Sequence, residues 1–554
     1  MREQVKGKLK VRAISGTYVV FLAFDMVESD AMGLMGFAIR RTDVLRQETE
    51  FLRGIKTFEL TSPVDGVGEV RSLEHPFQAF QWADYAVTPG KQYVYEVMAM
   101  YGKPGSLEAK YQVRIKIATE EVDDGTHAIH FNRGAIASQE YTRRFQGQPP
   151  SKVGEAAYSW LGRDLVPGLI QFIERAKDSS FDLHVAIYEI GIKQPLEALA
   201  AAKARGVKVH IVYHAKEGDE QTTENIDELT AAGLIGDSVG RAHVNLMHNK
   251  FIVLSRKSKP IAVWTGSTNW SVNAFYGQLN VGHAVTDAKT ASAFLDYWNA
   301  LASDLVDEDM RSWTSSQNLV PPSKPWKTIE PMFSPRSGKS MMGWWTELAN
   351  GGRPLFMTFP FGMGKEFQAV YDQNDGVLRF ALLDKFGNGA NAAAAEVALT
   401  MIRKLPNIGL SVAPRGKGTL VNQIDGWQRE VFAIGKNVNW VHTKFMLVDP
   451  LGPAPTTITG SANWSTNSVN ANDENMVAIF GDTRVADIYF GEFMRLFAHY
   501  RFRESVAWHL EAQGGDSKEP WTPKNLFTDW REWIPEHFRS GGEKDIKRRY
   551  FVGT

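Results

Sequence analysis

The sequence predicts an α/β protein in which two pseudo-symmetric αβα halves, each with a mixed or parallel sheet, follow a small all-β sandwich. Short strand-like segments separated by turn residues fill the beginning of the chain, whereas strand-like and helix-like segments alternate after it. A repeat supports the two halves: HNKFIVLS at 248–255 and HTKFMLVD at 442–449 are nearly the same, and GS-x-NW follows each after the same interval. A period of about 200 residues is too long for a solenoid and indicates a duplicated domain.

Residues 1–122 have the pattern of a β-sandwich. The segments KLKVRAI, TYVVFLAFDM, MGFAIRR and KQYVYEVMAMYG alternate apolar and polar residues and are joined by stretches rich in Gly, Pro, Asp and Ser. In the passage at 82–102, a turn at Pro89 and Gly90 leads into an alternating strand, which resembles the second half of a fibronectin type III-like module. We therefore expect an accessory β domain, whose function does not follow from its fold.

The first α/β half is expected at 128–318, after a polar, acidic linker, TEEVDDGTH. Residues 165–178 have apolar side chains at helical spacing, and 181–190 form an apolar run that is typical of a buried strand. The passage at 195–214 predicts a helix, a glycine stop and a strand. This order is a β-α-β unit, which predicts a parallel or mixed sheet.

The second half is expected at 327–512 and repeats this order of elements. Its predicted strands and helix are LFMTFPF (355–361), VLRFALLD (377–384), AAAAEVALTMIRKL (392–405) and IGLSVAP (408–414). The two halves also begin alike, with Arg133 and Arg336 each placed shortly after an apolar-Phe pair. The Trp-rich tail at 513–554 is expected to pack on the second half.

Composition excludes several kinds of site. The 554 residues carry a formal net charge of −1, so any attraction to nucleic acid or to an anionic membrane must be local. No cysteine is present, which removes disulfides, thiol nucleophiles and thiolate metal sites. No run approaches ~18 uninterrupted apolar residues, so no transmembrane helix is expected. The early apolar stretch YVVFLAF is followed by Asp25 and Glu28 rather than a cleavage site, so we expect a strand and a cytoplasmic chain, without excluding export by another route.

Both copies of the repeat place a His and a Lys two residues apart on a predicted strand, so the two side chains project from the same face. If the halves pack about a pseudo-two-fold axis, His248 and His442 face each other, and Lys250 and Lys444 flank a common cavity. A cavity of this kind suits one phosphate. A single His-x-Lys near a strand is usually incidental, but two copies at the same distance from GS-x-NW argue against chance.

This residue set predicts phosphoryl chemistry without a metal or other cofactor. Two lysines offset the charge of a phosphodiester and of its pentavalent transition state, as a metal does elsewhere. One imidazole attacks phosphorus to give a phosphohistidine, while the other protonates the leaving alkoxide and then activates water or an alcohol. Two such displacements retain the configuration at phosphorus. The residues expected to hydrogen-bond the phosphate oxygens are Ser267, Asn269, Ser461 and Asn463.

HTKFMLVD followed by GSANW resembles the His-x-Lys-x4-Asp and GS-x-N signature of the phospholipase D superfamily, and HNKFIVLS with GSTNW resembles its partner copy. The resemblance covers about 128–512. It implies two phospholipase D-like halves and metal-independent phosphohistidine chemistry. It leaves the substrate open, because the superfamily includes phospholipases, phospholipid synthases, endonucleases and phosphodiesterases that act on tyrosyl–DNA links.

The two copies differ at the Asp of the signature, where the first has Ser255 and the second has Asp449. The resemblance implies a mainly structural role for this Asp, so both positions are assigned to the support of the site. The copies differ again downstream, where NDENMVAIF contains Glu474, whereas the matching GQLNVGHAV offers Gln278 and Asn280 but no carboxylate. Gln278 is likewise assigned to the support of the site.

Glu474 is expected to orient His442, because the family places a carboxylate before an asparagine to hydrogen-bond the histidine. A carboxylate partner stabilises imidazolium and suits a general acid, whereas an imidazole without one is more easily neutral and nucleophilic. The hypothesis is therefore that His248 is the nucleophile and His442 is the acid and base, which is also the order that the resemblance implies.

Three functions remain open on the sequence. The first is a lipid-directed phospholipase D that hydrolyses or transfers the phosphatidyl group, with peripheral contact to a membrane. Near-neutral charge favours it, as do aromatic residues around the motifs, which either line an apolar mouth or belong to the core. These aromatic residues are Trp264, Trp270, Phe275, Tyr276, Trp440 and Trp464.

The second function is an endonuclease or nucleotide phosphodiesterase. The basic clusters RKSK (256–259), PRGKG (414–418) and KRR (547–549) argue for it, although such clusters are usually solvated loops. The third is a binding scaffold with a weakened active site, against which the intact His and Lys of both copies argue. Arg133 and Arg336 are expected either to reach the phosphate or to be structural. A small margin favours the phospholipase, and the oligomeric state stays open.

Overall fold

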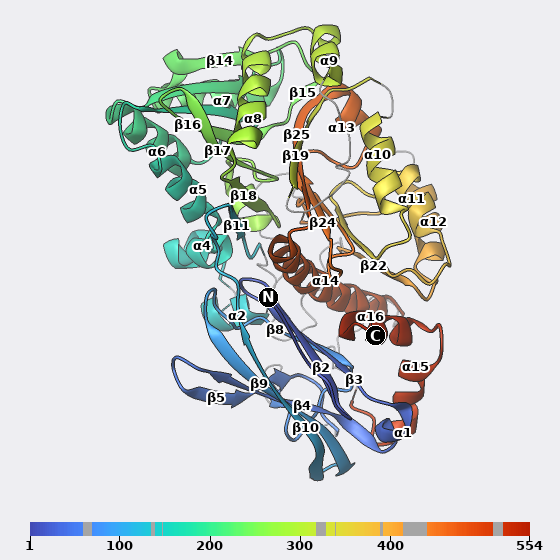
Figure 1. The fold of residues 1–554 in the computed structure, drawn as a ribbon. Helices are drawn as coiled ribbons and strands as arrows, with labels where there is room; N and C mark the ends of the chain where they lie inside the picture. The colour runs from blue at the N-terminus through green and yellow to red at the C-terminus, as the bar shows by residue number, and fades with distance from the viewer. Residues whose placement is uncertain are drawn as a thin grey trace.

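The computed structural model describes residues 1–58, 69–134, 139–146, 148–316, 328–337, 340–387, 392–413, 440–512 and 525–554. These residues form an N-terminal antiparallel β region and two α/β halves, each with its own mixed sheet (Figure 1). The predicted fold class is therefore confirmed.

The N-terminal region is a sandwich of two four-stranded antiparallel sheets. In order, the first sheet contains β1 (Arg2–Val5), β2 (Lys10–Ser15), β3 (Val20–Asp25) and β8 (Gln81–Asp84), and the second contains β10 (Ser106–Ala118), β9 (Gln92–Lys103), β4 (Leu34–Asp43) and β5 (Glu48–Phe51). A short ribbon, β6 (Arg53–Gly54) and β7 (Val70–Arg71), and helix α1 (Glu28–Ala31) complete it. Alternate residues such as Val11 and Ala13 of β2 and Tyr95 and Val97 of β9 are buried together, so the inner faces form one core.

The first half is built on a seven-stranded mixed sheet. In order, its strands are β11 (His127–Phe131), β18 (Val281–Val285), β17 (Lys259–Gly266), β16 (Lys250–Arg256), β12 (Phe181–Ile187), β13 (Lys208–His214) and β14 (Ser238–Arg241). β12 and β13 are parallel because α6 (Lys193–Ala204) crosses over between them, as the β-α-β pattern predicts. Gly206, just after α6, has a φ of 88°, a conformation that glycine adopts without steric cost.

The remaining elements of the first half cover this sheet or connect its strands. They are α2 (Gln139–Phe145), α3 (Pro150–Val153), α4 (Glu155–Gly162), α5 (Leu165–Glu174), α7 (Glu220–Ala231), η1 (Ile235–Asp237), η2 (Asn273–Gly277), α8 (Ala288–Ala302) and α9 (Asp307–Ser316). The basic cluster at 256–259 forms the tight turn between β16 and β17, in which Lys257 and Ser258 have positive φ.

The second half repeats the same strand order. Its main sheet runs β15 (Leu246–Met247), β25 (Asn472–Phe480), β24 (Thr456–Gly460), β23 (Phe445–Val448), β20 (Leu355–Phe359), β21 (Arg379–Leu383) and β22 (Ile408–Val412), and β19 (Thr328–Ser334) pairs with β25. Its helices are α10 (Ser340–Ala349), α11 (Lys365–Tyr371), α12 (Ala392–Ile402), α13 (Thr466–Ala471) and α14 (Thr483–Ala512). The strands at 445–448 and 251–254 are wholly buried, as expected for sheets covered on both faces.

Helices α10, α11 and α12 lie along the outer side of the second half in Figure 1. α8 and the long α14 contribute to a large core that also contains residues of both α/β sheets, such as Phe251 and Phe445. One core thus joins the two halves, and the strand ends that carry the repeated motifs meet across it.

At this junction, segments of one half pair with segments of the other half. β15 comes from the first half of the sequence but pairs in parallel with β25 of the second half, with Met247 opposite Asp473. In the mirrored position, Leu279 of the first half bridges to Val441 of the second. Each histidine motif is therefore delivered to the site beside a strand of the other half.

The C-terminal segment packs on the second half, as predicted, and on the β-sandwich, which was not predicted. α16 (Glu543–Val552) packs between that half and the β-sandwich, whereas η4 (Trp530–Glu532) and α15 (Ile534–Phe538) pack on the sandwich (Figure 1). Trp533 and Ile534 enter the sandwich core, and Arg548 pairs with Asp25. Phe551 contacts Phe380 of the second half, so the tail joins the two regions. Burial of large apolar side chains decides this placement.

Two further predictions concern charged segments. The acidic linker is held by Arg484 of α14, which pairs with Glu120 and Asp124. The cluster at 547–549 lies in α16, where acidic side chains of the helix or the sandwich pair with each basic residue. The cluster at 414–418 lies outside the described residues. Within the described ranges, no helix combines the length and apolarity that crossing a bilayer requires.

Candidate active site

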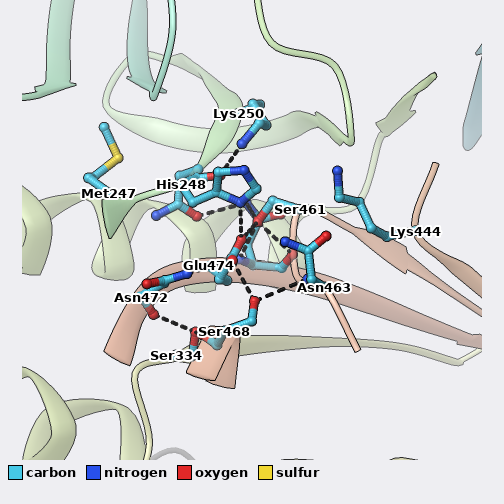
Figure 2. Close-up of polar contacts among 12 residues, drawn as sticks. Met247, His248, Lys250, Ser334, Lys444, Ser461, Asn463, Ser468, Asn472 and Glu474 are labelled. Carbon is cyan, nitrogen blue, oxygen red and sulfur yellow. Dashed lines mark hydrogen bonds and ion pairs between the residues drawn. The ribbon is translucent and has the colours of Figure 1, made fainter. Parts of the chain in front are cut away.

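His248 lies between β15 and β16, and its ring is held by a residue of the other half. Its Nδ1 donates to Glu474 Oε2 at 2.8 Å, and its backbone N–H donates to the carbonyl of Asp473 at 2.9 Å (Figure 2). Because a carboxylate only accepts hydrogen bonds, the Nδ1 proton is fixed and Nε2 carries the lone pair. No described residue hydrogen-bonds this Nε2.

His442 is held in the mirrored way by the first half. Its Nδ1 donates to Asn280 Oδ1 at 2.9 Å, and its backbone N–H donates to the carbonyl of Leu279 at 3.2 Å. The Asn280 amide nitrogen donates to the carbonyl of Ala274 at 2.9 Å, which leaves Oδ1 facing the imidazole. A neutral amide therefore takes the place that a carboxylate takes beside His248.

The expected pairing of Glu474 with His442 is wrong. Glu474 and Asn280 occupy equivalent places, each 13 residues after the serine that hydrogen-bonds it, but each supports the histidine of the opposite half. The reason is that β15 pairs with β25 of the other half, which puts β25 next to the segment that leads into His248. The sequence contains both groups but not their crossed assignment.

Ser267 and Ser461 belong to this support rather than to the phosphate. Ser267 Oγ donates to Asn280 Oδ1 at 2.7 Å, and Ser461 Oγ donates to Glu474 Oε2 at 2.7 Å. Each hydroxyl also accepts a backbone N–H, from Val281 at 3.1 Å and from Asn475 at 3.0 Å. Their predicted role as phosphate ligands is therefore replaced by one that positions the two groups that hold the histidines.

The Glu474 carboxylate is fully buried and surrounded by donors. In addition to His248 and Ser461, Ser468 Oγ donates to Oε1 at 2.6 Å and Asn472 Nδ2 donates to the same oxygen at 3.5 Å. Burial alone raises the pKa of this carboxyl, but the His248 ring and these hydrogen bonds outweigh it and lower the net pKa. Glu474 is therefore an anion when the site is empty.

The two lysines complete a site that the two halves share. Lys250 Nζ donates to the His248 carbonyl, and Lys444 Nζ lies 3.0 Å from His442 Nε2. Figure 2 shows Lys250 above the His248 ring and Lys444 to the right of it. Burial lowers the pKa of His442, and the charges of Lys444, Lys250 and His248 lower it further. Because residues of both motifs affect this pKa, the two motifs lie within electrostatic reach of each other.

Burial sets the charge state of the site. It lowers the pKa of Lys250 to about 7, against the opposing effect of Glu474 and Glu189, and it lowers the pKa of His248 to about 4. For Lys444, burial followed by the Lys250 charge lowers the pKa well below its ordinary value. A bound phosphodiester anion offsets these costs, because it supplies the negative charge that favours protonated lysine and imidazole.

The two asparagines of the GS-x-NW segments are not equivalent. Asn269 donates its amide to Glu189, whereas no described residue takes a hydrogen bond from the side-chain amide of Asn463, whose backbone N–H donates to Ser468 Oγ at 3.1 Å. Among the described residues, the side-chain oxygens of both asparagines are buried without a partner. Asn463 is thus the better placed of the two to donate to a phosphate oxygen.

Sequence reasoning missed Glu189. This residue follows β12, accepts from Asn269 and lies within electrostatic reach of Lys250, while Lys250 Nζ lies 5.2 Å from the ring centre of Tyr188. Burial raises the pKa of Glu189. A polar Tyr-Glu pair at the carboxyl end of a buried strand was the available signal. After β20, the corresponding residues are Pro360 and Phe361, so the second lysine lacks such a carboxylate.

Of the three residues assigned to the support, only Gln278 lies close to the histidines. Its Oε1 accepts from Asn280 Nδ2 at 3.4 Å. Ser255 is buried opposite Asp182 on β12, and its Oγ has no partner among the described residues. Asp449 follows β23 with a φ of 49° and is half-buried. Both of the latter lie seven residues along the strand from their histidine, outside the shared site.

The two arginines at the heads of the halves are structural. Arg133 donates to the carbonyl of Trp160 at 2.7 Å and lies over its ring, and the buried Arg336 donates to the carbonyl of Phe333 at 2.9 Å. Burial lowers the pKa of each guanidinium to about 10. Hydrogen bonds of this kind offset the cost of burying an arginine.

Most of the aromatic residues expected around an apolar mouth are core residues. Trp264, Trp270, Phe275 and Tyr276 pack in the core of the first half. Trp440 packs against the core between the halves. Trp464 differs, because it both packs in the core of the second half and lines a cavity.

This cavity has a volume of about 690 Å³ and lies in the second half beside the site. Its walls are largely apolar, with Phe359, Phe361, Met363 and Trp464 among the lining side chains. Asn463, Ser468 and Asn472 lie on its polar side. Because Ser468 and Asn472 also hydrogen-bond Glu474, the cavity reaches the layer that directly supports His248. Within the described residues, no group of three or more His, Asp or Glu side chains gathers as a metal site does.

The family described as cardiolipin synthase, PLD-like domain, matches residues 169–302 and 415–497. The matched segments contain both His-x-Lys motifs and both GS-x-NW segments. The predicted resemblance to the phospholipase D superfamily is therefore confirmed, and the matched segments lie in the two α/β halves.

Several solved structures are similar to parts of the chain. Nuc from Salmonella typhimurium, a phospholipase D family member, is 21% identical over 25% of this chain and 86% of its own, with a TM-score of 0.22. Phosphatidylserine synthase from Haemophilus influenzae Rd KW20 is 11% identical over 64% of this chain and 92% of its own, with a TM-score of 0.42. Yeast tyrosyl-DNA phosphodiesterase is 11% identical over 56% of this chain and 87% of its own, with a TM-score of 0.33. No curated protein matches the chain in sequence.

Proposed function

We propose that this protein cleaves or transfers a phosphodiester through a covalent phosphohistidine, without a metal ion. The observation that carries the proposal is the crossed support of His248 and His442, in which each half fixes the Nδ1 proton of the other half's imidazole. Both rings thereby present Nε2 to a site that also contains Lys250 and Lys444. Two imidazoles and two lysines are the groups that two successive displacements at phosphorus require.

His248 is the proposed nucleophile. The Glu474 carboxylate holds its Nδ1 proton at 2.8 Å and stabilises the positive charge that the ring gains when Nε2 bonds to phosphorus. At His442 the lone pair of Nε2 faces Lys444 Nζ at 3.0 Å, and its partner is a neutral amide. The assignment of His248 from the sequence is kept, but its basis changes from the absence of a carboxylate to the presence of one.

His442 is the proposed acid and base. In the first step His248 Nε2 forms a bond to phosphorus, the bond to the leaving alcohol oxygen breaks, and His442 Nε2–H transfers its proton to that oxygen. In the second step His442 takes a proton from water or an alcohol, whose oxygen bonds to phosphorus as the phosphorus–nitrogen bond breaks. Burial and the lysines lower the pKa of His442 in the empty site, so bound phosphate is needed to populate its acid form.

A phospholipid is the proposed substrate. The cavity beside the site has apolar walls at Phe359, Phe361 and Met363, which suits an acyl or glyceryl portion better than a polyanionic strand. The basic clusters that argued for nucleic acid lie in a hairpin turn or are paired in α16 where the structure describes them. The second step takes water or an alcohol, which makes hydrolysis and headgroup transfer two outcomes of one mechanism.

The test uses the purified full-length chain with EDTA and four substrates: phosphatidylcholine, phosphatidylglycerol, single-stranded DNA and double-stranded DNA. We expect cleavage of at least one phospholipid. With a substrate labelled at phosphorus, we expect the label to stay on His248 when the reaction is quenched without acid. His442→Ala is the matched variant, because it removes the acid but leaves the nucleophile. Activity on DNA alone would contradict the lipid assignment, and loss of activity in EDTA would contradict the mechanism.

A further inference from the structure

We propose that the exposed face of α12, together with the adjoining mouth of the apolar cavity, is the surface with which this protein lies on an anionic lipid bilayer. The inference rests on the proposed phospholipid-directed function and names the part of the molecule that meets the substrate's bilayer. It follows from the exposed side chains of one helix, from the position of the cavity and from the charges around both.

The outer face of α12 is unusually apolar for a solvent-facing helix. Val397 is 67% exposed and Met401 is 59% exposed, and the two lie one turn apart on the same face. Ala393 and Ala394 are exposed on the turn before them, and the polar residues among the exposed positions of this helix are Glu396 and Thr400. Single exposed apolar residues need no explanation, but a continuous apolar helix face marks an interaction site.

Helix α7 of the first half shows the ordinary pattern for comparison. Its exposed positions include Glu220, Glu224 and Asp227, its Leu229 is buried, and its one exposed large apolar residue, Ile226, is 38% exposed. An amphipathic helix that faces water places charges outward and apolar residues inward. α12 follows the rule on its inner side, where Leu399 is buried, and departs from it on the outer side.

The cavity opens at the beginning of this face. Ala394 of α12 and Lys365 of α11 line it and are exposed, which locates the mouth between these helices. From there the walls run past Phe361 and Trp464 to Asn463, beside the phosphate site. α12 lies on the outer side of the second half, away from the β-sandwich (Figure 1). A substrate that enters from a bilayer resting on α12 therefore has a direct apolar path to the site.

The charges around the face select an anionic lipid surface. Lys404 follows α12, is exposed and lies with its Nζ 3.8 Å from Met401 Sδ. Lys365 is exposed at the mouth, and Lys385 Nζ lies 5.1 Å from the ring centre of the half-buried Phe361. Lysines beside an apolar helix face add electrostatic attraction to anionic headgroups.

The size of the face argues against a protein partner or a second copy of this chain. A stable protein interface buries about 800 Å² on each side. The outer side of an 11-residue helix is a narrow strip rather than a patch of that size. A lipid surface requires no shape complementarity, because apolar side chains insert among acyl chains individually.

The experiment compares two double variants of the full-length chain. V397E/M401E places charges on the proposed surface, and V27E/M32E changes the same residue types at exposed positions of the β-sandwich, where Val27 is 60% and Met32 is 52% exposed. Each is mixed with vesicles of phosphatidylcholine alone or with an equal part of phosphatidylglycerol, and binding is measured by co-sedimentation. Activity on the soluble diester bis(p-nitrophenyl) phosphate and the thermal unfolding midpoint are measured in parallel.

We expect V397E/M401E to lose about tenfold or more in affinity for the phosphatidylglycerol vesicles, because two apolar side chains no longer insert and two anions approach the headgroups. V27E/M32E binds as the wild type does, and neither variant changes the unfolding midpoint or the cleavage of the soluble diester. Added salt weakens the wild-type binding to phosphatidylglycerol vesicles.

Vesicle binding of V397E/M401E at the wild-type level would overturn the proposal, as would a wild-type protein that binds no vesicles. A change in sedimentation coefficient between the wild type and V397E/M401E without vesicles would identify a second copy as the occupant, which also overturns it. These outcomes are separate from the catalytic proposal, since vesicle binding without phosphodiesterase activity would remove the function and leave the surface.

Discussion

Replacement of Glu474 by Gln tests the crossed support of the nucleophile. The carboxylate accepts hydrogen bonds from His248 at 2.8 Å, from Ser461 at 2.7 Å and from Ser468 at 2.6 Å, and no part of it is exposed to solvent. Gln keeps the volume of the side chain, but it removes the negative charge and turns one acceptor into a donor. The imidazole then loses both the fixed Nδ1 proton and the charge that stabilises its phosphorylated form.

The size of the effect follows from the role of the acid beside an imidazole. In serine proteases, replacement of the acid that holds the catalytic histidine by its amide lowers kcat about 10⁴-fold. We expect a loss of about 10³ to 10⁴ in kcat for E474Q, which corresponds to about 4 to 5.5 kcal/mol of transition-state stabilisation. The assay is single-turnover cleavage of bis(p-nitrophenyl) phosphate, with trapped phosphohistidine as a second readout.

The pH dependence gives an independent check on the same variant. His248 must be neutral to attack, and its pKa in the empty site is lowered to about 4, chiefly by burial and against the opposing effect of Glu474. The kcat/KM of the wild type therefore falls as pH decreases through about 4. Removal of the carboxylate lowers the pKa further, so the acidic limb of E474Q moves to lower pH. A kcat within tenfold of the wild type, or an acidic limb that moves upward, would refute the reasoning.

Three further predictions concern charges of the site and of the junction between the halves. N280D places a carboxylate beside His442, which raises the pKa of this imidazole. The basic limb of the pH–kcat profile therefore moves to higher pH, and an unchanged limb would contradict the assignment of His442 as the acid. Burial lowers the pKa of Lys250 to about 7, so this side chain binds phosphate as a cation only below that pH, and kcat/KM falls as pH rises through about 7. K250R removes this limb, because arginine stays charged. Asp473 and Arg241 form a fully buried pair across the halves at 2.9 Å, and Arg241 also pairs with Asp304 at 3.0 Å, so D473N lowers the free energy of unfolding by about 1 to 3 kcal/mol in urea titrations.

The wild type and K103E, a change at an exposed end of β9, provide the common controls for these three variants. K103E should leave both limbs of the pH profile and the urea midpoint unchanged, because surface substitutions away from paired groups alter stability little. If D473N unfolds at the wild-type urea concentration, the buried pair does not hold the halves together.

The fold was predictable in outline because local patterns determine its elements. The β-α-β unit at 181–214 and its repeat at 355–412 appear in the structure as parallel strand pairs, β12 with β13 and β20 with β21. Apolar runs such as FIVL and FMLV predict strands that are buried on both faces. The contacts of the tail with the β-sandwich were not predicted, because Trp533 and Ile534 indicate burial but not against which surface.

The candidate site was predictable in its members and less so in its contacts. His248, Lys250, His442 and Lys444 are identified by the repeat alone, and the structure brings them to one place. Ser267 and Ser461 were expected on the phosphate, but their hydroxyls hold Asn280 and Glu474. A serine in a motif signals a hydrogen bond without naming its partner, since a hydroxyl donates and accepts equally well. Glu189 was missed because its place after Tyr188 at the end of a buried strand indicates a polar site but does not identify Lys250 as its neighbour.

The sequence by itself determined the class of fold, the duplication and the kinds of side chain available for phosphoryl chemistry, because periodicity and repetition are local properties of the chain. Only the tertiary structure decided that Glu474 supports His248 and Asn280 supports His442. That assignment depends on β15, which leaves its own half and pairs with β25, so that each strand carries its polar residue to the opposite histidine. Contacts between residues more than 160 positions apart are set by how the sheets pack, and two copies of one motif carry no record of which copy faces which partner.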